Sequence, residues 1–64
     1  MQDKNGKLLD LGMIVSIINQ PDLFDSHGWI LIDFIEMGVH TYYFLQHCVT
    51  QEIRLFESKD IERG

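Results

Sequence analysis

The sequence predicts a small all-β protein, an antiparallel barrel of four to five strands with a short helical turn near the C-terminus. Short runs of β-branched and aromatic residues alternate with turn signals, and the two longest runs are apolar on both faces. Strands that are apolar on both faces need cover on both sides, and a sheet that closes on itself covers one of them. A chain of 64 residues has room for one core, so we expect residues 1–64 to form a single domain.

Runs of β-forming residues give the expected strands in chain order. These strands are Met13–Ile18, Trp29–Glu36, His40–Cys48 and Glu52–Phe56. The polar stretch 19–28 contains the only proline and predicts a loop that folds back onto the core. The short segment 37–39 predicts a hairpin turn between the two longest strands. A single helical turn, Ser58–Glu62, is expected to follow, with Ser58 as its cap.

Successive residues of a strand point to opposite faces, so a choice of register decides which side chains form the core. We expect the following residues to point inward: Val15, Ile17, Ile30, Ile32, Phe34, Tyr42, Phe44, Ile53 and Leu55. A slip of one residue would exchange the two faces of a strand. Because both faces are apolar, the opposite register remains an alternative at this point.

The spacing of glycines and apolar residues resembles that of small SH3-like barrel proteins of the kind encoded by bacteria and phages. In that pattern a glycine precedes the first strand, a long loop follows, and another glycine leads into the second strand. The positions that fit are Gly12, Val15, Gly28, Ile30, Tyr42, Ile53 and Ile61. Met13 departs from the pattern, which usually has an acidic residue there. The opening segment 3–7 also resembles the start of phage YopX-like proteins. The SH3-like fold is shared by proteins of many functions and therefore implies none by itself.

The charge balance argues against binding to duplex DNA. Ten acidic residues outnumber five basic ones, which gives a formal net charge of −5. The basic residues are scattered along the chain, so no basic stripe can form to neutralise phosphates. No apolar run approaches the roughly 18–20 residues of a membrane span, so we expect no membrane partner. The single cysteine suits a reducing compartment, and we expect a cytoplasmic location.

Candidate catalytic and metal-binding residues do not form a convincing pattern. The possible metal ligands are His27, His40, His47 and Cys48. His47 and Cys48 are adjacent in a predicted strand and should point to opposite faces, so we expect neither a metal nor any other cofactor. A nucleophilic cysteine also needs a nearby base and a positive environment, which this acidic chain does not provide. We therefore predict that the protein is not an enzyme.

An outward-facing aromatic surface is the main functional prediction. In the chosen register, the residues expected on the outer side of the main hairpin are Trp29, Leu31, Asp33, Ile35, Tyr43 and Leu45. Such a patch would exceed what most soluble monomers expose. We therefore predict a protein-interaction module that forms a homodimer or binds another protein. The alternative is a nucleic-acid-associated small barrel, or an acidic decoy that occupies a nucleic-acid-binding protein.

Overall fold

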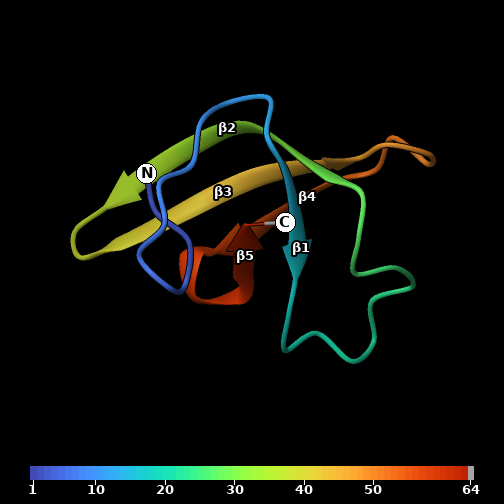
Figure 1. Ribbon diagram of the computed structural model, residues 1–64, viewed down its shortest axis with the longest axis horizontal. Helices are drawn as coiled ribbons and strands as arrows, with labels where there is room; N and C mark the ends of the chain where they lie inside the picture. The colour runs from blue at the N-terminus through green and yellow to red at the C-terminus, as the bar shows by residue number, and fades with distance from the viewer. Residues whose placement is uncertain (64) are drawn as a thin grey trace.

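In the computed structural model, which describes residues 1–63, the chain forms five strands and one 3-10 turn (Figure 1). The elements are β1 (Ile14–Ile17), β2 (Trp29–Met37), β3 (His40–His47), β4 (Ile53–Glu57), η1 (Ser58–Asp60) and β5 (Ile61–Arg63). The predicted all-β class, the hairpin and the helical turn near the C-terminus are thereby confirmed. The end of the chain differs from the prediction, because the turn ends at Asp60 and Ile61 begins a fifth strand. Ser58 is not a side-chain cap; Glu57 occupies the cap position.

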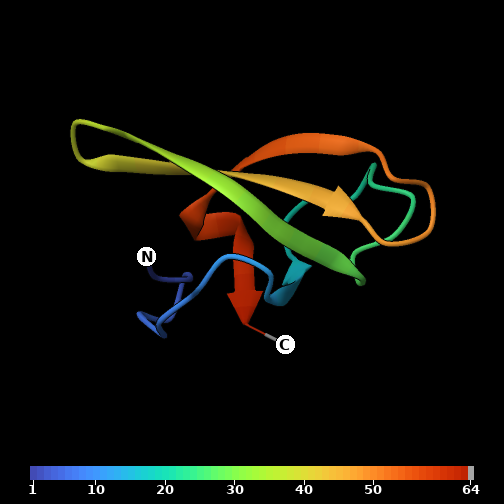
Figure 2. The ribbon, with the colours of Figure 1, turned by 90° about the horizontal axis from the view of Figure 1, so that it is seen from above.

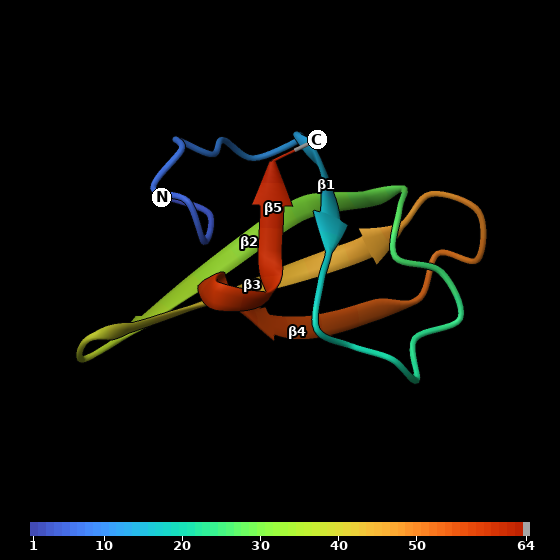
Figure 3. The ribbon, with the colours of Figure 1, turned by 60° about the horizontal axis from the view of Figure 1, so that its bottom comes forward.

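All five strands belong to one antiparallel sheet in the order β4-β3-β2-β1-β5. The sheet curls strongly, so that β1 and β5 run across the inner side of β3 and β4 (Figures 2 and 3). The turn η1 connects β4 to β5, the two ends of the sheet. This arrangement, with a long loop between β1 and β2, is that of a small SH3-like barrel.

The hydrophobic core lies between the two crossing layers. Its nine buried residues are Leu9, Val15, Ile17, Trp29, Leu31, Tyr43, Leu45, Phe56 and Ile61. Trp29 is the largest of them and is fully buried, with its ring edge against Phe56 at 5.5 Å between centroids. Its indole N–H donates to the backbone oxygen of Asp25 at 2.9 Å, so burial leaves no polar group of this side chain unpaired.

A β-bulge in β2 determines which side chains enter this core. Leu31 lies opposite Leu45 of β3, and Asp33 lies opposite Phe44, so Ile32 is an extra residue between them. An inserted residue shifts the alternation of the strand by one position. Leu31 before the bulge therefore points inward and Asp33 after it points outward.

This shift corrects the predicted set of inward-facing residues. Val15 and Ile17 are buried as expected, and Phe34 packs against the core. The other six point to the opposite side of the sheet and are half-buried or exposed: Ile30, Ile32, Tyr42, Phe44, Ile53 and Leu55. The register of β3 and of β4 is thus the opposite of the one chosen. In β2 the chosen register holds only after the bulge, where Phe34 points inward.

A buried carboxylate joins the two ends of the chain. Asp3 is only 5 % exposed, and its oxygens accept hydrogen bonds from the backbone N–H groups of Asn5, Lys7 and Arg63 at 2.8–2.9 Å. Burial by itself raises the pKa of a carboxyl group. Here the three N–H donors and the charge of Lys7 outweigh burial and hold the pKa of Asp3 below its ordinary value. The backbone of Lys4 also donates to Ile61, so the N-terminal turn covers the outer edge of β5.

Replacing Asp3 by Asn should lower the free energy of unfolding at neutral pH by about 1–3 kcal/mol, because an amide has one acceptor oxygen for three N–H donors. The lowered pKa of Asp3 stabilises the fold above the ordinary value of 3.8, and this contribution disappears as the pH falls through the folded-state pKa. Urea denaturation between pH 7 and pH 3 should therefore show a steeper loss of stability for the wild type than for Asp3→Asn. Equal losses would contradict this assignment.

Candidate interaction surface

The side of the sheet that faces away from the core carries a mostly apolar surface, which we call the outer sheet face. The strand register aligns its side chains in rows across the sheet. The first row runs from β1 to β4 and consists of Ile14, Ile30, Gln46 and Ile53. The second row runs from β2 to β4 and consists of Asp33, Phe44 and Leu55. A third row begins with Ile35 and Tyr42. Ile32, the extra residue of the bulge, lies beside the second row.

Several of these apolar side chains are exposed to solvent. The exposed fraction is 38 % for Ile32, 42 % for Ile35, 54 % for Ile53 and 51 % for Leu55. Single exposed apolar residues are common, but here those of β2 and β4 flank the half-buried Tyr42 and Phe44 of β3, so that together they form a patch. Such patches in soluble proteins usually mark places where another molecule binds.

The structure separates the six residues predicted to form the interaction surface. Trp29, Leu31, Tyr43 and Leu45 are at most 1 % exposed and belong to the core, so their predicted outward position is wrong. Only Asp33 and Ile35 lie on the outer sheet face, because the bulge shifts them outward. The sequence reasoning missed Ile14, Phe44, Ile53 and Leu55, which it had assigned to the core or left unassigned. The sequence pattern places these residues in strands. Because the strands are apolar on both faces, the pattern does not show which face points to the core.

The charged groups beside this surface differ in whether they have a partner. Glu57, opposite Tyr42 in the third row, pairs with Lys59 at 3.6 Å and accepts a hydrogen bond from His40 at 2.7 Å. Asp33 differs from these groups: its carboxylate accepts only the backbone N–H of Phe34, and among residues 1–63 no cation pairs with it. The outer sheet face is therefore apolar with one uncompensated carboxylate.

His47 and Asp25 form a polar cluster whose hydrogen bonds hold the long loop to the sheet. His47 is 3 % exposed, and its Nδ1 accepts from the backbone N–H groups of Val49 and Thr50 at 3.2 and 3.3 Å. The ring proton therefore lies on Nε2, which donates to Asp25 at 3.0 Å. The backbone N–H of His27 and this bond from His47 hold the pKa of Asp25 below its ordinary value. Both ring nitrogens are occupied, which fastens the loop 18–28 to β3.

Among residues 1–63, no side chain forms a hydrogen bond with the Cys48 thiol. This thiol is exposed, whereas the neighbouring His47 is buried and uses both ring nitrogens elsewhere. A Cβ at Gly28 would lie 2.8 Å from the Cys48 Sγ. The thiol therefore packs against Gly28 and leaves no space for a side chain at position 28. Residues 1–63 contain no group of three or more His, Cys, Asp or Glu side chains that could hold a metal ion.

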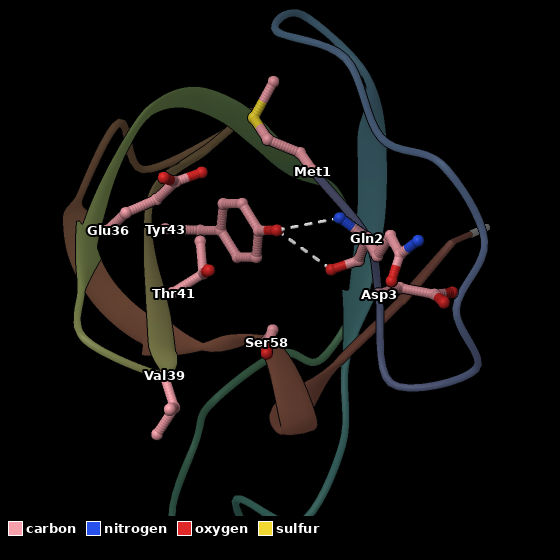
Figure 4. Close-up of a pocket in the computed structure, with 8 residues that line it drawn as sticks. All are labelled: Met1, Gln2, Asp3, Glu36, Val39, Thr41, Tyr43 and Ser58. Atoms are coloured by element: carbon pink, nitrogen blue, oxygen red, sulfur yellow. Dashed lines mark hydrogen bonds between the residues drawn. The ribbon is translucent and has the colours of Figure 1, made fainter.

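A polar hollow of about 330 Å³ lies between the N-terminus, the β2–β3 hairpin and η1 (Figure 4). Tyr43 points into it from β3, and its hydroxyl both donates to and accepts from the backbone of Gln2, at 2.9 and 3.0 Å. The carboxylate of Asp3 at its edge is bound by backbone N–H groups. Burial raises the pKa of Tyr43, so this hydroxyl stays protonated at neutral pH. Two of the polar residues that line the hollow, Tyr43 and Asp3, thus serve the fold.

Comparison with protein-family models, with curated proteins and with solved structures finds no match to this chain. The resemblance of the opening segment to YopX-like proteins therefore stays a prediction. Within residues 1–63, no helix is long and apolar enough to cross a membrane.

The two faces of the sheet should respond very differently to truncation. Trp29→Ala should cost about 3–5 kcal/mol of unfolding free energy, because it leaves a cavity in a nine-residue core. Leu55→Ala, on the half-exposed outer sheet face, should cost less than about 1 kcal/mol. Chemical denaturation of both variants measures the difference. A larger cost for Leu55→Ala would mean that the faces are assigned the wrong way round.

Proposed function

We propose that this chain is a non-enzymatic protein-interaction module that associates with a second copy of itself through the outer sheet face. The observation that carries the proposal is the set of exposed apolar side chains on β2 and β4, typified by Ile32, Ile53 and Leu55, with the half-buried Phe44 of β3 between them. The absence of an available base beside Cys48 within the described residues supports a binding role over a catalytic one. A reducing cytoplasm suits a module with one exposed thiol.

A dimer of ordinary size would use a large share of the surface of so small a chain. A stable interface buries about 800 Å² on each partner, which is about one fifth of the 4164 Å² that this chain exposes. A small domain with a nine-residue core also gains stability from any apolar area that association removes from water.

A second copy is the simplest occupant because the face can pair with itself. A two-fold interface places the same patch on both partners and closes after two copies. Arg54 is already paired with Glu52 within each copy, and Glu57 with Lys59, so two faces can meet without forcing these groups together. Apolar side chains such as Ile53 and Leu55 would then supply the contact area.

Leu55→Glu should convert the dimer to a monomer, because it places a charge in the contact area. Sedimentation velocity at about 100 µM measures the result. Val39→Glu is the matched control: Val39 is 95 % exposed in the β2–β3 turn, and the substitution changes the net charge equally. Ile53→Glu provides a second variant in the same face.

A dimeric wild type and Val39→Glu, with monomeric Leu55→Glu and Ile53→Glu, would support the proposal once circular dichroism shows that all four are folded. A wild type that stays monomeric at this concentration would contradict it. So would a dimer that both outer-face variants retain.

We expect duplex DNA binding to be weak, which argues against the nucleic-acid alternative. Among the five basic residues, Lys4, Arg54 and Lys59 already pair with Glu62, Glu52 and Glu57. Non-specific affinity depends on cations that neutralise phosphates, and typical dissociation constants at physiological salt are about 10⁻⁴–10⁻⁶ M. Fluorescence anisotropy with random duplex DNA should show weaker binding than this range. Micromolar binding would favour the nucleic-acid alternative.

A further inference from the structure

We infer that Asp33 limits the strength of self-association through the outer sheet face. This inference rests on the proposed function, because it assigns a role to one residue within the same surface. Asp33 follows the bulge of β2 and points outward, opposite Phe44 in the register. Its side chain accepts one local hydrogen bond, from the backbone N–H of Phe34 at 2.8 Å.

The position of Asp33 makes it unavoidable for a partner. Ile32 and Ile35 flank it on β2, and Phe44 lies beside it on β3. A second copy that covers these three apolar side chains must also approach the carboxylate between them. In a regular strand that buries Leu31, residue 33 would also face the core. The bulge instead places the Asp33 carboxylate on the outer sheet face.

Covering this carboxylate is unfavourable for a homodimer. Removing water from a charged group costs free energy unless a cation or several donors replace the water. Within residues 1–63 no cation of the same copy pairs with Asp33, and a two-fold interface buries one such group from each partner. The net charge of −5 on each copy adds repulsion. The apolar side chains favour association, and Asp33 opposes it.

Asp33→Asn tests the inference, because the amide keeps an oxygen that can accept the N–H of Phe34 and removes only the charge. We expect the dissociation constant of the dimer, from sedimentation equilibrium, to fall by about tenfold or more. The control is Asp22→Asn, which changes the net charge equally at an exposed position of the loop 18–28. Asp22→Asn should change the constant by less than about twofold, because repulsion between distant exposed charges is screened by salt.

Asp33→Lys separates desolvation from repulsion. Lysine keeps a charge in the face while making the whole chain less acidic, so a local cost of desolvation predicts that its dimer stays weaker than that of Asp33→Asn. A lysine dimer tighter than the asparagine dimer would mean that overall repulsion dominates and would overturn the inference. An unchanged or weaker Asp33→Asn dimer would overturn it too, while loss of the dimer in Leu55→Glu would still support the proposed function. If neither the wild type nor Asp33→Asn associates, both proposals fail.

Discussion

The β-bulge of β2 is the constraint on which the rest of the structure depends. Strand β2 pairs with β1 at its beginning and with β3 along its whole length, so it belongs to both layers of the curled sheet. The extra residue Ile32 lets Leu31 and Phe34, three positions apart, both face the core. Without it, a strand that buries Leu31 would turn Phe34 outward. The bulge also increases the local twist, as expected where β1 and β5 cross the other strands.

Polar anchors at the ends of the molecule compensate for the small core. Asp3 binds the N-terminal turn to β5, and the pair of Asp25 and His47 binds the long loop to β3. In both places a carboxylate meets donors that are fixed by the backbone or by a buried ring, so little conformational entropy is lost to form the bonds. A domain of this size has too little apolar burial to hold such segments by packing alone.

The sequence was sufficient for the fold class and for the place of most elements, because glycines, turn signals and β-branched runs act locally. It was insufficient for the inner and outer faces, since the residues at 30 and 31, or at 44 and 45, are equally apolar. The bulge leaves no distinct local signature, although Asp33 in an apolar run was a hint that the strand is irregular there. The pairing of Asp25 with His47 spans 22 residues and depends on the loop path, so spacing could not reveal it.

The exposure of the outer sheet face is also a consequence of the small size of the domain. Long strands with two apolar faces give a stable sheet, but residues 1–63 cover only one of those faces, where β1 and β5 cross. In the dimer that we propose, a second copy would supply the missing cover without lengthening the chain. An entirely apolar face would also recruit unrelated surfaces and exposed strands, which is the usual hazard of such patches. On our proposal, one carboxylate at the bulge would reduce that hazard while leaving the neighbouring isoleucines available. The irregularity that lets both Leu31 and Phe34 face the core would then also moderate what the other face binds.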